Sequence, residues 1–301
     1  MHIPDGFLTN RIALSLDVVS GAGILYAARR AKVDISGRTA PIMGMLAAFV
    51  FAAQMLNFPV LGGTSGHLIG GSLLAVLLGP LIGTLTMASV VIAQALFLQD
   101  GGLVALGANI FNISAVTCFS GYAVFKLFGK RIIVEGKHLF LAGFFAGWCS
   151  VMVSSACCAF EMGLSGAIPL HIGLPAMLSY HAIVGIVEGM LTGGVLKFLL
   201  KVRPDLMKDE GGTGFGIPDW IGAMLLVAIP VALLIVAGSS SLPDPLEKLL
   251  GATPIASGAV PANPLSSSRI GDYMIRSAAF ILLVGLGILV SRLVRSRRSR
   301  S

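Results

Sequence analysis

Nine long apolar stretches constrain the fold of this chain more than any other feature. They cover about residues 11–28, 40–58, 67–79, 81–98, 107–128, 138–160, 174–198, 219–238 and 272–291. Most of them approach the roughly 20 residues that a helix needs to cross a bilayer, and the third is clearly shorter. With 55% hydrophobic and 12% charged residues, the composition excludes an ordinary soluble globule, in which about 25% of residues are charged. The sequence predicts an all-α integral membrane protein with about nine transmembrane helices.

The basic residues predict how these helices are oriented. They cluster after the first, fifth, seventh and ninth apolar stretches, all on one side of the membrane if there are nine spans. The positive-inside rule makes that side cytoplasmic, which leaves the N-terminus extracytoplasmic and the C-terminus cytoplasmic. The net charge of +7 therefore reflects topology rather than a nucleic-acid partner. We expect a multi-pass protein of the cell inner (cytoplasmic) membrane.

The chain begins with a potential metal chelate formed by Met1 and His2. The α-amine of Met1, the amide nitrogen of His2 and its imidazole can wrap one ion in two fused, nearly planar rings. One in-plane position stays open, and planar nitrogen coordination suits Ni(II) or Cu(II). A histidine near an N-terminus is otherwise usually solvated on a frayed end. The first residues lack the basic run and the cleavage site of a removable signal peptide. We therefore expect Met1 and its α-amine to remain on the protein.

A glycine-rich stretch supplies a candidate fourth nitrogen. Residues 61–71 are too polar to face lipid, and irregular backbone at membrane depth persists only when it is buried in protein or lines a cavity. His67 lies here, on the same predicted side as Met1. It is either a metal ligand or a structural histidine bonded to a neighbouring carbonyl. Four polar residues lie nearby in the sequence: Gln54, Asn57, Thr64 and Ser65. We expect their side chains either to hold the imidazole in one tautomer or to join helices.

The remaining histidines and the cysteines are weaker candidates. His181 and Glu188 are seven residues apart and share a helix face, and ionisable groups inside a span are functional candidates. For this pair we favour helix packing or indirect support of the site over direct ligation. His171 and His138 are not assigned to the site. The four cysteines lie in apolar stretches without zinc-site spacing, and we expect buried, inert thiols at Cys118, Cys149, Cys157 and Cys158.

Three segments carry a family resemblance that covers about residues 1–200. MHIPDGFL, QMLNFPVLGGTSGHLIGG and HAIVGIVEGMLTG resemble the NikM/CbiM family, the substrate-capture subunits of nickel and cobalt energy-coupling-factor (ECF) transporters. The resemblance implies a membrane protein that binds one divalent metal ion through the N-terminal amine, the backbone and side-chain nitrogens of the second residue, and a further histidine. In this chain those ligands are Met1, His2 and His67.

The C-terminal third differs in character and predicts a second domain. We expect a metal-capture domain over residues 1–204, a polar, glycine-rich linker over 205–218, and an accessory segment of two helices over 219–301. Between those two helices, Ser241–Lys248 resembles the PDGLE motif of the accessory subunit NikN/CbiN, with Pro245 where that motif has glycine. The resemblance implies a fusion of capture and accessory subunits. The alternative is two additional anchoring helices.

The sequence favours a transporter subunit over other membrane functions. It lacks the G-x-x-x-x-G-K-[ST] phosphate loop, so the resemblance implies separate ATP-binding-cassette ATPases and a transmembrane coupling (T) subunit as partners. No nucleophile–base pattern indicates an enzyme, and Ni(II) or Co(II) is expected as transported substrate rather than as a catalytic cofactor. The alternatives are a cobalt-uptake subunit serving cobalamin synthesis, or a stand-alone secondary carrier. Such a carrier would be expected to show internal repeats, and none is evident.

Overall fold

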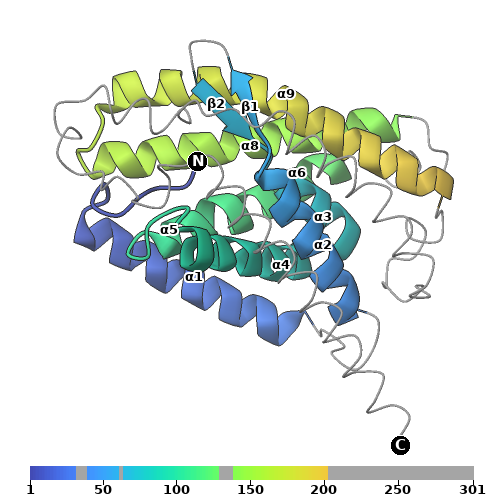
Figure 1. The fold of residues 1–301 in the computed structure, drawn as a ribbon, viewed down its shortest axis with the longest axis horizontal. Coiled ribbons are helices and arrows are strands. Elements are labelled where there is room, and N and C mark those ends of the chain that lie inside the picture. The colour runs from blue at the N-terminus through green and yellow to red at the C-terminus, as the bar shows by residue number, and fades with distance from the viewer. Residues whose placement is uncertain (32–38, 61–63, 129–137, 203–301) are drawn as a thin grey trace, which may run out of the picture.

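The structure is a computed structural model that describes residues 1–31, 39–60, 64–128 and 138–202 (Figure 1). This part contains almost all of the predicted metal-capture domain. The predicted linker over 205–218 and the accessory segment over 219–301, with its two helices and PDGLE-like motif, lie outside the described residues. The proposed domain boundaries therefore stay predictions.

The described part of the chain is mostly helical. Its elements, in chain order, are α1 (Asn10–Arg30), α2 (Thr39–Gln54), β1 (Asn57–Val60), β2 (Thr64–His67), α3 (Gly71–Leu78), α4 (Pro80–Ala93), η1 (Gln94–Leu98), α5 (Leu106–Asn109), η2 (Ile110–Val116), α6 (Thr117–Leu127), α8 (Leu139–Leu164) and α9 (Leu170–Val202). The two η segments are π-helical and continue their neighbouring α-helices without a break. π-Helical turns are rare in proteins overall, but those that do occur often lie at functional sites.

Five helices in the described residues are long and apolar enough to cross a membrane. They are Asn10–Arg30, Pro80–Leu98, Leu106–Leu127, Leu139–Leu164 and Leu170–Val202. The second predicted stretch forms the shorter apolar helix α2, and the third forms the eight-residue helix α3. The chain is thus a helical membrane protein as predicted. The total of nine spans and the orientation of the two termini remain predictions.

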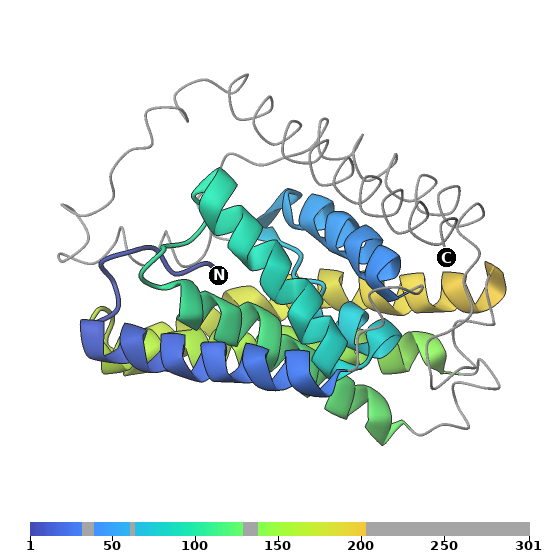
Figure 2. The same cartoon turned by 90° about the horizontal axis from the view of Figure 1, so that it is seen from below.

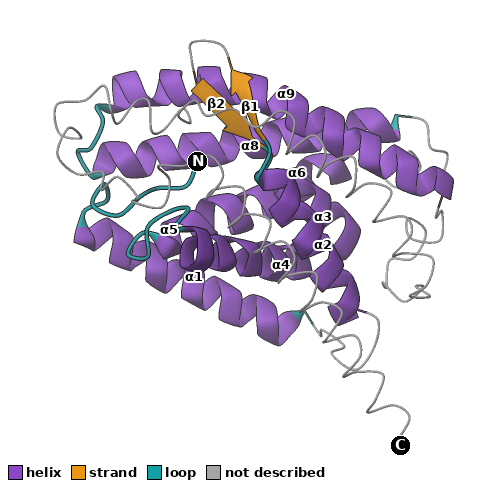
Figure 3. Cartoon of the chain, in the orientation of Figure 1, coloured by secondary structure: helices purple, strands orange, loops and turns teal. Residues whose placement is uncertain are grey.

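A β-hairpin within the described residues departs from the predicted all-α class (Figure 3). Strands β1 and β2 are antiparallel, and their register places Asn57 opposite His67 and Val60 opposite Thr64. Proline removes a hydrogen-bond donor from a helix and glycine weakens one, so Pro59 and Gly66 both disfavour helix in this segment. The hairpin places His67 at the end of a strand rather than on a helix.

Close helix packing forms one side of the bundle. Figures 1 and 2 show α8 and α9 side by side, with α1 on the opposite side and α3 to α6 between them. Glycines allow the α8–α9 contact, because a Cβ added at Gly143 would lie 2.8 Å from the Cα of Gly193. A Cβ added at Gly147 would lie 2.9 Å from the Cα of Gly189. Small residues bring membrane helices together in this way.

Candidate metal site

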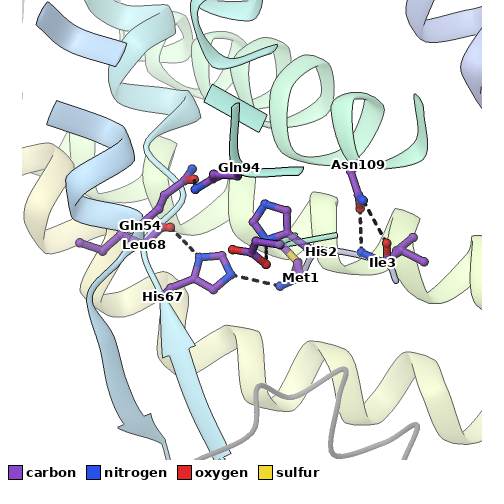
Figure 4. Close-up of polar contacts among 9 residues, drawn as sticks. Met1, His2, Ile3, Gln54, His67, Leu68, Gln94 and Asn109 are labelled. Carbon is purple, nitrogen blue, oxygen red and sulfur yellow. Dashed lines mark hydrogen bonds and ion pairs between the residues drawn. The ribbon is translucent and has the colours of Figure 1, made fainter. Parts of the chain in front are cut away.

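The first three residues of the chain are buried between the helices rather than frayed. Met1 is 2% exposed, His2 6% and Ile3 0%. The side-chain amide of Asn109 binds both polar groups of the Ile3 backbone (Figure 4). The Ile3 N–H donates to Asn109 Oδ1 at 2.7 Å, and Asn109 Nδ2 donates to the Ile3 carbonyl at 3.0 Å. This clamp fixes the backbone directly after the predicted chelate.

A second contact anchors the N-terminal segment to the start of α5. The Asp5 carboxylate accepts hydrogen bonds from the backbone N–H groups of Leu103, Val104 and Ala105, at 3.0, 2.8 and 3.2 Å. A carboxylate at a helix N-terminus satisfies free N–H donors and interacts favourably with the helix dipole. Gly102 donates its N–H to the Ile3 carbonyl at 2.9 Å, and a Cβ at this position would overlap Asp5.

His67 faces the N-terminal amine. The Met1 nitrogen lies 3.2 Å from His67 Nε2, and His67 Nδ1 lies 2.9 Å from the Leu68 carbonyl oxygen. Because a carbonyl can only accept, Nδ1 carries the hydrogen and Nε2 presents its lone pair toward the amine. The ring of His2 stacks on that of His67, with centroids 5.4 Å apart. The bond to a neighbouring carbonyl that was expected of a structural histidine is thus present, and it aims the other ring nitrogen at Met1. The role of His67 as a metal ligand stays a prediction.

The surroundings of His67 keep its imidazole neutral. Burial lowers the pKa of His67 from its ordinary value to about 4, and the nearby N-terminal amine and His2 act in the same direction. The Asp100 carboxylate and the Leu68 carbonyl oppose this shift in the pKa. A lowered pKa means that the ring loses its proton at a lower pH than usual. At neutral pH the imidazole is therefore in the form that a metal ion requires.

His2 presents Nδ1 to an acidic residue. His2 Nδ1 lies 3.2 Å from Asp100 Oδ1, whose side chain is 42% exposed. Nδ1 is also the ring nitrogen that closes a six-membered chelate with the His2 amide nitrogen, because Nε2 lies too far around the ring. A metal ion held by this chelate would replace Asp100 at Nδ1. Asp100 thus places a partly exposed negative charge beside the candidate ligands.

Two of the predicted supporting residues bind the backbone that follows His67. Gln54 donates from Nε2 to the Ile69 carbonyl at 2.6 Å, and its Oε1 accepts from Gln94 Nε2 at 2.6 Å (Figure 4). Glu188 accepts from the N–H groups of Ile69 and Gly70, at 2.8 and 2.7 Å. Both side chains thus support the backbone after His67 rather than bonding to its imidazole. They connect α2, η1 and α9 to the segment that carries His67.

The other predicted supporting residues are Asn57, Thr64, Ser65 and His181. Asn57 is half-buried and lies opposite His67 in the hairpin. Thr64 and Ser65 belong to β2 by their backbone, and the roles of their side chains stay predictions. His181 is buried, and its Nδ1 lies 2.8 Å from the Met177 carbonyl of its own helix, which supports a packing role.

None of the four cysteines, all of which lie in the described residues, forms a disulfide bond. Cys118 and Cys158 are buried as predicted. The prediction of burial is wrong for Cys149 and Cys157, which are half-buried because each lies on a side of α8 that is only partly covered. Across the described ranges, no three His, Cys, Asp or Glu side chains gather as a metal cluster. The candidate site depends instead on the amine and a backbone nitrogen.

Sequence reasoning missed three residues that position the N-terminus: Asn109, Asp5 and Asp100. Two signals were available. Asn109 is a polar residue inside an otherwise apolar stretch, where such residues are usually structural or functional. Asp100 lies in the polar turn Gln99-Asp100-Gly101-Gly102, on the predicted side of Met1. The glycines of this turn are required, since Gly101 has φ +91° and its Cβ would lie 3.2 Å from the Cβ of His2.

Fold and site together define the class of this protein. A bundle of membrane-length helices enclosing a buried N-terminal amine and two imidazoles indicates a multi-pass membrane protein with a candidate metal site. The chain belongs to the CbiM family, described as the cobalt uptake substrate-specific transmembrane region, whose model matches residues 2–206. The resemblance to NikM/CbiM proteins drawn from three short segments is thereby confirmed.

Individual relatives support this assignment over different lengths of the chain. A candidate metal transport protein of Haloquadratum walsbyi is 42% identical, over 69% of this chain and 93% of its own. A candidate fused nickel transport protein of Archaeoglobus fulgidus, NikMN, is 34% identical over 98% of this chain and 100% of its own. A crystal structure of a truncated transition metal transporter is 30% identical with a TM-score of 0.60, and the match covers 67% of this chain and 99% of that one.

Proposed function

We propose that this chain is the substrate-capture subunit of an ATP-driven ECF importer, which takes up Ni(II) at the outer face of the membrane and delivers it to the cytoplasm. The observation that carries the proposal is the convergence of Met1, His2 and His67. Their nitrogens meet in a buried site, with the Met1 amine 3.2 Å from His67 Nε2. Family membership and the full-length match to a relative named for nickel transport point the same way.

The spacing of the donors supports planar coordination. In a square plane, the Met1 amine, the His2 amide nitrogen and His2 Nδ1 would fill three corners, and the open corner lies beside the amine. With metal–nitrogen bonds of about 2.0–2.1 Å, adjacent corners are about 2.9 Å apart and opposite corners about 4 Å apart. The 3.2 Å between the Met1 nitrogen and His67 Nε2 fits adjacent corners. Completing the plane would require His2 Nδ1 to exchange Asp100 for the metal ion.

The donor set favours nickel over cobalt. Nitrogen sites bind Ni(II) more tightly than Co(II), and planar nitrogen coordination is typical of Ni(II) and Cu(II). Cobalt remains the alternative substrate because the family description itself names cobalt uptake. In that case the subunit would serve cobalamin synthesis. Selectivity against copper must then come from the geometry of the buried site and from metal supply, since Cu(II) stands above both in affinity.

The energy source is proposed to be external. Because the sequence lacks a phosphate loop, separate ATPases acting through a T subunit would drive transport. The accessory segment over 219–301 is proposed to be a fused NikN/PDGLE-like subunit. Nickel uptake by cells should then require co-expression of the ATPases and the T subunit. Equal uptake by this chain alone would favour the secondary carrier instead.

X-ray absorption spectroscopy of the nickel-loaded, purified protein tests the coordination directly. We expect four nitrogen neighbours at about 2 Å in a planar arrangement. A six-coordinate shell of oxygen atoms would overturn the proposed site. Parallel calorimetric titrations with Ni(II) and Co(II) would decide between the two substrates, because the proposal requires tighter nickel binding.

A further inference from the structure

A second polar pair lies inside the bundle, apart from the nitrogen cluster. Asn112, on η2, donates from Nδ2 to Oε2 of Glu161, on α8, at 2.6 Å. Asn112 is 0% and Glu161 7% exposed. Within the ranges that the structure describes, Asn112 Oδ1 and Glu161 Oε1 have no hydrogen-bond partner. Both unsatisfied atoms are acceptors, and they belong to two side chains that already touch.

Glu188, another buried glutamate of this bundle, provides a comparison for Glu161. Its two oxygens each accept a backbone N–H, from Ile69 and Gly70. Glu161 has one donor, a neutral amide, and no ion pair within the described residues. A buried charge without compensating donors or a counter-charge is strongly unfavourable. The two glutamates thus differ in the number of donors that can stabilise a negative charge, two for Glu188 and one for Glu161.

In the part of the chain that the structure describes, no cationic group is seen to bond or pair with Glu161. From η2 it faces Asn112, and on its own helix its titratable neighbour is the Cys157 thiol. On α1, Asp17 instead accepts the Gly107 N–H, and on α9, Glu188 is committed to the backbone after His67. Neither of these groups compensates a negative charge on Glu161.

We propose that Glu161 is a proton-binding site inside the membrane bundle and is a neutral acid in the resting protein. The proton is carried on Oε1 and donated to Asn112 Oδ1, while Asn112 Nδ2 continues to donate to Oε2. A carboxylic acid and an amide then form a closed pair of two hydrogen bonds. One proton taken from solvent satisfies both of the unpartnered oxygens.

The position of this pair links it to the N-terminus. Asn112 lies one helical turn after Asn109, whose side chain clamps Ile3 at 2.7 and 3.0 Å. The Asn112 carbonyl also accepts the Ser154 hydroxyl of α8 at 2.8 Å. The acid–amide pair therefore fixes η2, the π-helical segment that directly follows Asn109 and its contact with Ile3. Glu161 acts as a positioning residue for the metal site, and this part of the inference rests on the proposed function.

Infrared difference spectroscopy of the full chain in detergent tests the proton site without metal. Relative to wild type, Glu161→Gln should lose one carbonyl stretching band of a protonated carboxylic acid, and that band should shift in heavy water. Glu188→Gln is the matched control and should leave the acid band in place. If the band survives in Glu161→Gln, or disappears in Glu188→Gln instead, Glu161 is not the protonated group.

A second pair of variants keeps the test informative if Glu161→Gln folds poorly. It also tests whether the acid–amide pair is coupled to the metal site. Asn112→Ala should keep the acid band but move it to higher frequency, because the acid loses its amide partner; an unmoved band would contradict the pairing. Glu161→Gln, which can form the same two bonds, should retain nickel affinity, whereas Glu161→Ala should lower it about tenfold. Equal nickel affinities in Glu161→Gln and Glu161→Ala would contradict a positioning role for Glu161. Absence of nickel binding in the wild type would overturn the proposed function and leave the infrared result standing.

Discussion

The nitrogen of Met1 lies 3.2 Å from Nε2 of His67, across a sequence separation of 66 residues. The contact joins the end of the chain to the end of a β-hairpin. Ile3 is tied to Asn109 on one side, and Ile69 is tied to Gln54 and Glu188 on the other. Both partners of the contact are thus fixed by bonds from other helices, which prepares them to accept a metal ion without large rearrangement.

A short Gly-Ser extension ahead of Met1 should abolish the buried metal site. The extension converts the proposed ligand amine into an amide, and Met1 is only 2% exposed, so the added residues cannot be accommodated. Calorimetric nickel titration of the purified protein measures the loss. The same extension placed after Ser301 is the control and should leave binding intact. Full nickel affinity in the N-terminally extended protein would contradict the role of the amine.

His67→Ala should reduce nickel affinity more than about 100-fold, since loss of an indirect partner alone typically costs 10–100-fold. The variant should still fold, because the Met1 and His2 donors and the helix contacts remain. His171→Ala, which changes an exposed histidine on α9, is the matched control. Unchanged affinity in His67→Ala would reassign His67 to a purely structural role.

Asn109→Ala should weaken nickel binding about tenfold or more without removing a ligand. The substitution deletes both hydrogen bonds to Ile3, so the N-terminal segment becomes free to leave the site. Hydrogen exchange at the Ile3 amide should accelerate in parallel. Ser120→Ala on the same transmembrane helix removes a hydroxyl that binds within its own helix and serves as the control. Protection of Ile3 equal to that of wild type would count against the clamp.

Glu188→Gln should destabilise the segment that carries His67. The amide has one acceptor where the carboxylate offers two, so one buried N–H of Ile69 or Gly70 loses its partner. The free energy of unfolding should fall by about 1–3 kcal/mol, and nickel affinity should fall with it. Ser179→Ala, an exposed position on α9, provides the comparison. A variant with wild-type stability and affinity would show that these bonds do not position His67.

Nickel affinity should decrease as the pH is lowered from about 8 to about 6, since α-amines titrate at about 7.7–8.0 and imidazoles at about 6.5. His67 does not contribute to this decrease. Its pKa is lowered to about 4, so the ring is already unprotonated throughout this range. The slope of affinity against pH should therefore be the same in His67→Ala as in wild type, at a lower level. A flat profile for the wild type would exclude the amine and His2 as ligands.

Much of the protein follows from local sequence. Helix formation in a membrane depends on the length and polarity of each stretch, so five spans of the described region were predictable from composition alone. The chelate proposed for Met1 and His2 also follows from the sequence, because its three nitrogens lie on one short piece of backbone. His67 was accessible by a weaker argument, through the polar character of its glycine-rich surroundings.

Tertiary structure decided how these groups meet. The Leu68 carbonyl selects which nitrogen of His67 faces Met1, and this ring is positioned by a β-hairpin where the sequence had indicated only irregular backbone. Asn109 and Glu188 act on backbone 106 and 119 residues away, respectively. No periodicity in the sequence encodes such pairs, because they arise from the packing of helices against one another. Local chemistry determined which nitrogens can bind a metal, and only the packed bundle determined that they face each other.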